Sequence, residues 1–312
     1  MRIETERLIL RYFTLEDTPD VYKYSCNPRV AVPAAWLPHK TMEYSRRIVE
    51  KFIRSKEIAI WSKELGRVIG SIGVFSPVDS ALNGREISYA LAEEVWGQGL
   101  MKEALNYAIG YIFEEYRCPN LYLCNFLDNS ASRRVAEGIG FTYIKEFLYT
   151  DIPDGSPKMV RYYELKYEDF YEFRFSFTKE EYRDFRNLVG FKALEENQLN
   201  AVIENSTYRI AVRNQGRIVG MARCISDKAY LYLLCDVMVH PQAQHRGIGK
   251  RMLNRFIKNL KYKIGNQYAK IYIMSLKGKE GFYQSVGFTE DIATGLTIEW
   301  EGKPYGNEGK KD

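Results

Sequence analysis

The sequence predicts two α/β domains in tandem, and three observations support this fold class. The chain has 312 residues, 46% of them hydrophobic, which is enough for two cores of ordinary size. The pattern Gly-Arg-(Val/Ile)-(Ile/Val)-Gly occurs at Gly66–Gly70 and again 150 residues later at Gly216–Gly220. Two further glycine landmarks recur in the same order, Gly99 with Gly247 and Gly140 with Gly287. A shared frame across three landmarks favours two copies of one domain.

Strand and helix patterns alternate from the start of the first copy. Alternating apolar residues predict a strand at 7–13, and Thr14 and Thr41 stand where helix N-caps belong. Further elements follow in this order: a hairpin of strands 57–62 and 67–75 about residues 64–66, a strand at 86–91 after the turn Asn83-Gly84, an amphipathic helix at 99–116, a strand at 121–126, a helix at 129–138 ending at a glycine, and strands on either side of 151–155.

The second copy starts near Glu172, and Thr178 with Glu181 predicts a capping box at the start of a helix. The later elements are strands at 207–213, 217–225 and 230–239, a helix at 249–261, a strand at 270–275, a helix near 279–286 and a strand at 296–300. We therefore expect domains at 1–168 and 172–312. The joint at 167–171 has no Gly, Pro or Ser and predicts packed domains, and the polar tail from 302 is expected to fray.

Composition excludes several classes of function. The net charge of +5 comes from 45 basic and 40 acidic residues without a long basic run, which does not predict nucleic-acid binding. Five cysteines without a C-x-x-C pair, and only three histidines, predict neither a metal site nor a disulfide framework. The N-terminus has no apolar signal region and no run of 18 apolar residues occurs, so we expect a soluble cytoplasmic protein that does not bind membranes.

Each copy contains a loop with spaced glycines between a strand and a helix. The loops are residues 96–101 and 244–249, and such a loop binds anions because backbone N–H groups and the helix dipole both favour negative charge. Lys102 in the first copy, and Arg246 and Lys250 in the second, add positive charge. Neither loop has the third glycine of a dinucleotide-binding loop or the Gly-Lys-Ser/Thr of a Walker A loop.

These residues resemble the GNAT family of N-acetyltransferases. Val237–Pro241 followed by Gln244–Gly249 is similar to the acetyl-CoA signature of that family, and Phe282–Phe288 is similar to its second signature. The first copy resembles the Rim-type branch, which modifies protein N-termini and small amines, on these segments: Thr5–Arg11, Glu86–Tyr89, Trp96–Ala104 and Asn129–Phe141. The resemblance implies that each domain is a mixed, mostly antiparallel sheet with a central splayed pair of parallel strands and flanking helices.

The resemblance also implies that acetyl-CoA is the co-substrate, with its pyrophosphate on the glycine loop and no metal. The candidate cofactor-binding residues are Leu91, Trp96, Gly97, Gln98, Gly99, Leu100, Met101, Lys102 and Asn129 in the first copy, and Val237, Val239, Gln244, His245, Arg246, Gly247, Ile248, Gly249 and Lys250 in the second. Departures from the family pattern are Trp96, Met101, Ala136 in place of a tyrosine, and Leu276 in place of an asparagine.

Three residues are candidates for catalysis. Tyr283 occupies the family position of the general acid that protonates the leaving thiol. Glu86 and Asp236 lie on the strands that precede the two loops, where a carboxylate could act as the base for the incoming amine. The acceptor is expected to be a small-molecule or peptide amine, and the protein a monomer with paired domains or a homodimer. The alternative is an acyl-CoA-binding sensor or scaffold in which one or both copies are catalytically degenerate.

Overall fold

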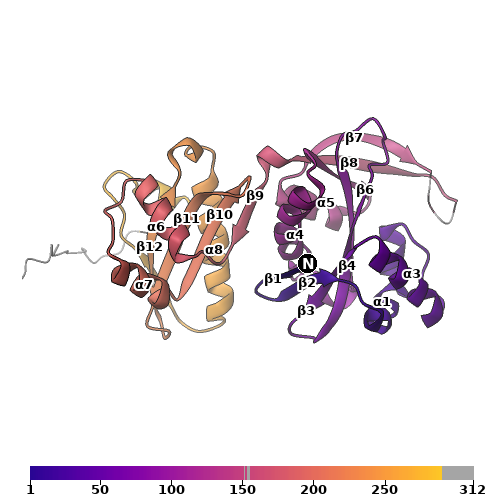
Figure 1. Cartoon of the computed structure of the whole chain (residues 1–312), viewed down its shortest axis with the longest axis horizontal. Helices are drawn as coiled ribbons and strands as arrows, with labels where there is room; N and C mark the ends of the chain where they lie inside the picture. The colour runs from indigo at the N-terminus through magenta and orange to yellow at the C-terminus, as the bar shows by residue number, and fades with distance from the viewer. Residues whose placement is uncertain (151, 153–154, 290–312) are drawn as a thin grey trace, which may run out of the picture. The chain divides into compact units, whose positions relative to one another are not determined.

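A computed structural model describes residues 1–150, 152 and 155–289 of the chain. The chain divides into two compact units, Met1–Phe177 with Ile210–Gly220, and Thr178–Arg209 with the residues from Met221 onward. The described strands form one sheet of eight strands and one of five, each with flanking helices (Figure 1). The predicted α/β class with two mixed sheets is therefore confirmed. The strand predicted at 296–300 and the polar tail lie outside the described residues.

The first sheet has the strand order β1-β2-β3-β4-β5-β6-β8-β7. Its strands are β1 (Arg2–Glu4), β2 (Leu8–Tyr12), β3 (Ile58–Ser62), β4 (Arg67–Phe75), β5 (Arg85–Leu91), β6 (Asn120–Phe126), β7 (Thr142–Tyr149) and β8 (Lys158–Lys166). Within the described part of this sheet β5 and β6 are parallel, and every other neighbouring pair is antiparallel. The predicted central parallel pair is thus present.

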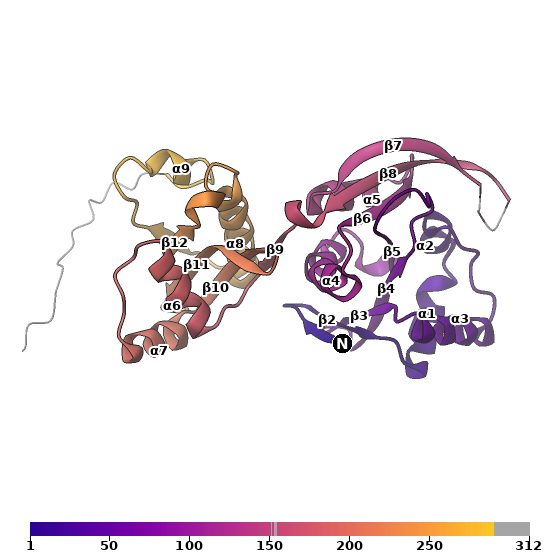
Figure 2. The ribbon, with the colours of Figure 1, turned by 45° about the horizontal axis from the view of Figure 1, so that its top comes forward.

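Three of the five described helices of this domain begin at a side-chain cap. The five are α1 (Thr18–Ser25), α2 (Pro28–Ala31), α3 (Met42–Arg54), α4 (Leu100–Tyr116) and α5 (Ser130–Ile139), with short 3-10 turns η1 (Leu15–Asp17), η2 (Val32–Ala34) and η3 (Glu93–Val95). The hydroxyl of Thr41 accepts a hydrogen bond from Tyr44 N (3.1 Å), which satisfies a free N–H at the start of α3. In Figure 2, α1 and α3 lie together on one face of the sheet and α4 lies on the other.

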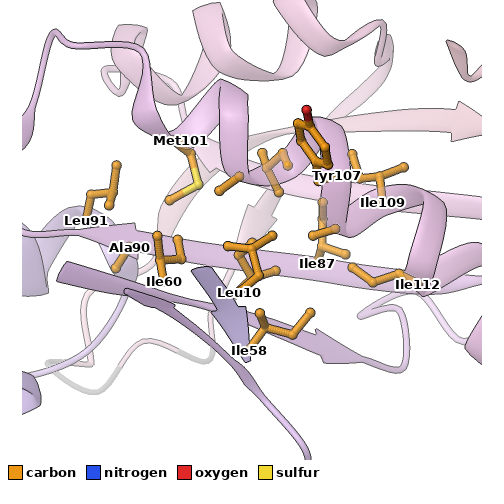
Figure 3. Packing of buried hydrophobic residues seen from close by; sticks show 14 of the residues in the cluster. Leu10, Ile58, Ile60, Ile87, Ala90, Leu91, Met101, Tyr107, Ile109 and Ile112 are labelled. Carbon is orange, nitrogen blue, oxygen red and sulfur yellow. The ribbon is translucent and has the colours of Figure 1, made fainter. Parts of the chain in front are cut away.

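The core of the first domain is the contact between α4 and the sheet. Ile109 and Ile112 of α4 and Ile87 and Leu91 of β5 lie in one layer of buried apolar side chains (Figure 3). Burying a side chain of this size contributes about 1.5–3 kcal/mol, so this layer fixes the position of the first turn of α4 against the end of β5. The layer includes Met101, which follows the glycine loop directly.

The second sheet has the strand order β13-β12-β11-β10-β9. Its strands are β9 (Tyr171–Arg174), β10 (Tyr208–Asn214), β11 (Arg217–Ser226), β12 (Leu231–Val239) and β13 (Lys270–Ile273), and the helical segments are η4 (Tyr167–Asp169), α6 (Lys179–Leu188), α7 (Glu196–Asn205), η5 (Pro241–Ala243), α8 (Ile248–Ile264) and α9 (Glu280–Gln284). Strands β12 and β13 are parallel, as the resemblance implied. The capping box is confirmed: Thr178 Oγ1 accepts from Glu181 N (3.1 Å), and Glu181 accepts from Thr178 N (2.9 Å).

Candidate functional site

The two glycine loops have the same backbone conformation. Each follows a 3-10 turn, η3 or η5, and leads into a helix of 17 residues, α4 or α8. Gly97 and Gly99 have φ values of +77° and +77°, and His245 and Gly247 have values of +61° and +72°. Left-handed backbone therefore occurs at the same two positions of both loops. His245 adopts this conformation without being a glycine, which only the structure reveals.

The loop residues are open to solvent in both domains. Residues 96–99 and 244–247 are exposed, including Gln98 and Arg246, and Lys250 is exposed in the first turn of α8. The side chains of Leu100, Met101 and Ile248 are buried in the core, so these residues can present only their backbone N–H groups to a ligand. Exposed N–H groups at the start of a long helix form an anion-binding site.

A side-chain hydrogen bond joins each loop to the end of the strand before it. Trp96 Nε1 donates to Leu91 O at 2.9 Å, and Gln244 Nε2 donates to Val239 O at 3.2 Å. The two donors occupy the same place in their loops, and the two acceptors are the last residues of β5 and β12. Trp96 departs from the family pattern but makes the same hydrogen bond. Its indole N–H takes the place of the side-chain N–H of Gln244 in the second domain.

The parallel strands of each domain pair over a short segment only. In the first domain, Arg85–Ile87 pair with Leu121–Leu123, although β5 runs on to Leu91 and β6 to Phe126. In the second domain, pairing of β12 with β13 ends at Leu234, five residues before Val239. The splayed pair implied by the resemblance is thus present in the first domain, where both strands continue past their last pair. In the second domain β13 ends at Ile273, and Val237 lies in the part of β12 that extends beyond it.

The second glycine of the second loop, Gly249, lies in a tightly packed position. A β-carbon on Gly249 would lie 3.1 Å from Phe282 Cζ and 3.3 Å from Val239 Cγ2. This close approach brings α9 against the first turn of α8. In the first domain Met101 stands at the position that corresponds to Gly249. Met101 on α4 and Ala136 on α5 are thus both part of the buried core of this domain.

The remaining predicted cofactor residues have identified contacts. Asn129 caps α5, since its side-chain oxygen accepts from Ser132 N at 3.0 Å. Lys102 is exposed, and its ammonium lies so close to Gly138 of α5 that a β-carbon on that residue would collide with it. Leu276, where the family pattern has asparagine, is 78% exposed.

Glu86 lies on β5 within a hydrogen-bonded environment that favours proton exchange. Its Oε2 accepts from Tyr162 Oη at 2.5 Å and from Val78 N at 3.0 Å, and no donor among the described residues is bonded to Oε1. Burial raises the pKa of Glu86, and the bonds from Tyr162 and Val78 oppose this rise. A raised pKa makes this carboxylate a stronger base than an ordinary glutamate, and Oε1 is the oxygen without a bonded donor among the described residues.

Tyr162 was not predicted as a functional residue, because it belongs to an aromatic run (162–175) whose expected role is packing. The strand register places Glu86 opposite Tyr122, and Cys124 opposite Tyr162, so all four side chains share one face of the sheet. The rings of Tyr122 and Tyr162 stack with centroids 5.6 Å apart and planes within 1°. Burial and the neighbouring Glu86 raise the pKa of Tyr162, which keeps its hydroxyl protonated as a donor. No sequence pattern near Tyr162 identifies Glu86 as its partner.

Asp236 has a different environment from Glu86. It lies on β12 beyond the segment paired with β13, and its φ of +50° is a left-handed conformation in the middle of a strand. Its carboxylate accepts from Tyr182 (2.7 Å), Arg186 (3.2 Å) and Arg223. Burial raises the pKa of Asp236, but Arg223 and the other donors outweigh it and the net pKa is lowered. Asp236 is therefore a stable carboxylate and a weak base.

Tyr283 lies on α9, beside the segment that packs against the second loop. Its ring meets those of Phe282 and Phe288 edge-on, with centroids 5.0 and 6.2 Å away. The residue is partly exposed, and burial raises the pKa of its hydroxyl, which therefore carries its proton at neutral pH. His240 caps η5 by accepting from Gln242 N (3.1 Å), so its Nδ1 has a local role.

Comparison with known families identifies both halves of the chain. A family model described as an acetyltransferase (GNAT) domain matches residues 7–142, and a second model with the same description matches residues 176–299. Together the two matches cover most of the chain. Among curated proteins, the uncharacterized N-acetyltransferase p20 of Bacillus licheniformis is 26% identical over 165 residues, which are 51% of this chain and 91% of that protein.

Two further relatives cover smaller or more divergent parts. The chloroplastic serotonin N-acetyltransferase 2 of Oryza sativa subsp. japonica is 29% identical over 107 residues, 33% of this chain and 52% of that protein. A solved structure of a GNAT-family acetyltransferase from Bacillus anthracis has 24% identity and a TM-score of 0.47, covering 53% of this chain and 98% of that one. None of the helices in the described part of the chain has the length and apolar character needed to cross a membrane.

Proposed function

The chain belongs to the GNAT acetyltransferase family, and we propose that it is an N-acetyltransferase that uses acetyl-CoA and acetylates a primary amine directly. The acceptor is a small-molecule amine or a peptide N-terminus. One observation carries the proposal: the two glycine loops have left-handed backbone at the same two positions and are exposed at the start of 17-residue helices. An anion such as a pyrophosphate fits this arrangement of N–H groups.

The residues present fit acetyl-CoA on chemical grounds. When bound, it supplies an acyl group activated as a thioester. The loop amides from Gly97 to Met101, and from His245 to Gly249, would hold the pyrophosphate, with Arg246 and Lys250 adding charge in the second domain. The strand ends at Leu91 and Val239 are fixed by the side-chain bonds from Trp96 and Gln244, which keeps each loop in register with the splayed strand.

The amine must lose a proton before it can attack a carbonyl carbon. A side-chain amine with a pKa of about 10.4 is almost entirely charged at pH 7, whereas an α-amino group with a pKa near 8 is roughly one-tenth neutral. In the first domain Glu86 Oε1 is the proposed acceptor of this proton, because Oε2 is held by Tyr162 and Val78 N. No covalent intermediate on the protein is required, since the amine itself is the nucleophile.

In the second domain Tyr283 is the proposed donor of the proton that the departing thiol needs. Asp236 was predicted as a base there, and its lowered pKa gives it less driving force for accepting a proton than Glu86 has. We propose that its negative charge, fixed by Arg186 and Arg223, orients the amine, while proton removal depends more on water than in the first domain.

Calorimetric titration of the full-length chain with acetyl-CoA tests the proposal. Gly99→Glu and Gly247→Glu each place a carboxylate in one loop. The matched controls are Gly66→Glu and Gly216→Glu, because all four glycines have φ between +61° and +77° and no atom within 4 Å of an added β-carbon. The backbone strain, about 1–2 kcal/mol for a left-handed residue, is therefore similar in all four variants.

We expect two acetyl-CoA sites in the wild type and in both controls, and one site in each loop variant. A site count that falls equally in loop variants and controls would attribute the loss to backbone strain. A single wild-type site, lost only in Gly247→Glu, would restrict cofactor binding to the second domain. A chain that binds no acetyl-CoA would refute the proposed function.

The second candidate function is an acyl-CoA-binding protein without transferase activity. The observation in its favour is Ala136, which stands where Tyr283 stands in the second domain and is fully buried, so the first domain has no hydroxyl at that position. Release of free thiol from acetyl-CoA in the presence of a panel of primary amines separates the two functions. Two occupied sites without amine-dependent thiol release would establish the binding protein.

A further inference from the structure

We propose that Arg7 and Glu103 act as positioning residues that fix the conformation and the charge of the first anion-binding loop. They form a clamp, defined here as the ion pair between Arg7 on the N-terminal segment and Glu103 in the first turn of α4, together with the bond from Arg7 to the loop. This inference rests on the proposed function, because it concerns acetyl-CoA binding by the first domain.

The contacts of the clamp bring together the segment before β2, the loop and the helix. Glu103 Oε1 accepts from Arg7 N at 2.9 Å and from Thr5 Oγ1 at 2.5 Å, and Oε2 accepts from Arg7 Nε at 2.7 Å. Arg7 Nη2 lies 2.6 Å from Oε2, and Nη1 donates to the carbonyl oxygen of Gln98 at 3.0 Å. One guanidinium therefore connects a carboxylate on α4 with a carbonyl of the loop. The side chains of Arg7 and Glu103 are only 26% and 15% exposed.

The bond to Gln98 fixes the direction of a loop amide. In a trans peptide the C=O and the following N–H point in opposite directions. Holding the carbonyl of Gln98 at Arg7 therefore directs the N–H of Gly99 away from Arg7. Gly99 has left-handed backbone and no side chain, so its peptide plane has many alternative orientations when Arg7 is absent.

The ion pair also neutralises a charge that would oppose an anion. Glu103 lies one helical turn into α4, since its N–H bonds the carbonyl of Gly99 at 3.1 Å. At the corresponding position of the second domain the N–H of Arg251 bonds the carbonyl of Gly247 at 3.0 Å. One loop thus has a carboxylate where the other has a guanidinium. A carboxylate so near a bound pyrophosphate repels it unless a cation compensates, and Arg7 supplies that cation.

The test is acetyl-CoA titration of the full-length chain carrying Gly247→Glu, which leaves the first site for measurement. We expect Arg7→Met to weaken binding about ten-fold, corresponding to about 1.4 kcal/mol. The matched control is Arg2→Met, which removes an exposed ion pair with Glu4 on β1 and should change affinity less than two-fold. Thermal unfolding of both variants verifies that the first domain stays folded.

A double variant separates charge from structure. Adding Glu103→Gln to Arg7→Met removes the uncompensated carboxylate and should recover about half of the lost affinity on a logarithmic scale. If the loss came instead from damage to the fold, the double variant would bind acetyl-CoA no better than Arg7→Met alone. If Arg7→Met fails to fold, Arg7→Lys is used in its place. Lysine keeps the positive charge but cannot bond the carboxylate of Glu103 and the carbonyl of Gln98 at the same time, so acetyl-CoA binding should still weaken several-fold. Unchanged affinity in the folded arginine variants, or no recovery in the double variant, overturns the inference. A wild-type chain without a Gly99-dependent site also overturns the inference and restricts cofactor binding to the second domain, whereas a chain that binds no acetyl-CoA at all refutes the proposed function.

Discussion

Replacing Tyr162 by Phe removes one hydroxyl group and tests the assignment of Glu86 as the base of the first domain. The ring stays in place, because Tyr162 is fully buried and stacks on Tyr122. The substitution deletes the 2.5 Å bond to Glu86 Oε2 and leaves the bond from Val78 N. We expect the acidic limb of the pH–rate profile to move to higher pH, since a bond that favours the ionised carboxylate is lost while burial continues to raise its pKa.

The size of the effect follows from the charge on the acceptor. A hydrogen bond to a charged group contributes about 1.5–3 kcal/mol, and 1.4 kcal/mol corresponds to a factor of ten in an equilibrium. The pKa of Glu86 should therefore rise by about one unit in the variant, and acetyl transfer at a fixed pH on the acidic limb should be roughly ten-fold slower. The pH dependence of the free energy of unfolding should change as well. Because the pKa of Glu86 is raised in the folded state, its contribution to stability is fully present below the unfolded-state pKa. That contribution is lost as the pH rises through the folded-state pKa. The stability deficit of Tyr162→Phe should thus be larger at alkaline than at acidic pH.

The assay is release of free thiol with saturating acetyl-CoA and a primary amine, followed from mildly acidic to alkaline pH in the Gly247→Glu background. Tyr163→Phe is the matched control, because Tyr163 is also buried but lies on the opposite face of β8 from Tyr162. Glu86→Gln should slow the reaction by roughly 10²–10⁴ and remove the acidic limb. An acidic limb that stays in place in Tyr162→Phe, or near wild-type rates in Glu86→Gln, would refute the assignment.

Two further predictions concern the loops themselves. Trp96→Phe deletes the 2.9 Å hydrogen bond to the end of β5, and since a neutral hydrogen bond contributes about 0.5–1.5 kcal/mol, acetyl-CoA binding should weaken about three-fold. Trp96→Gln should bind as the wild type does, because Gln244 makes the same hydrogen bond in the second domain. Calorimetry measures the affinity of both variants. Gly249→Ala places a β-carbon 3.1 Å from Phe282 and should lower the stability of the second domain by about 1–3 kcal/mol, measured by thermal unfolding. The control is Gly281→Ala, which should leave the stability unchanged because no atom lies within 4 Å of the added β-carbon.

Those parts of the fold that depend on local chemistry could be predicted from the sequence. The hairpin of β3 and β4 turns at Gly66 with φ +61°, and the helix caps at Thr41 and Thr178 have the expected bonds. Glycine and short polar side chains impose their conformations on neighbouring residues, whatever the rest of the chain does. For the same reason the left-handed backbone at Gly99 and Gly247 agrees with the glycine spacing from which both loops were predicted as anion sites.

Short edge strands and exact element ends could not be predicted in this way. Strands β1 and β9 have three and four residues, too few for alternation to be recognised, and β1 is held by pairing with β2. Helix α8 continues to Ile264 beyond the predicted 261, and β13 stops at Ile273 before the predicted 275. These limits are set by neighbours that are distant in sequence.

The two candidate bases show why a site cannot be assigned from spacing alone. Glu86 and Asp236 were predicted together because each lies on the strand before a loop, yet the pKa of one is raised and the pKa of the other is lowered. The difference comes from the donors: a neutral hydroxyl 76 residues away in sequence bonds Glu86, while two guanidinium groups bond Asp236. A neutral donor leaves a buried carboxylate able to take up a proton, and paired cations remove that ability. The division of chemistry that we propose between the two domains therefore depends on Tyr162, Arg186 and Arg223 rather than on the carboxylates themselves.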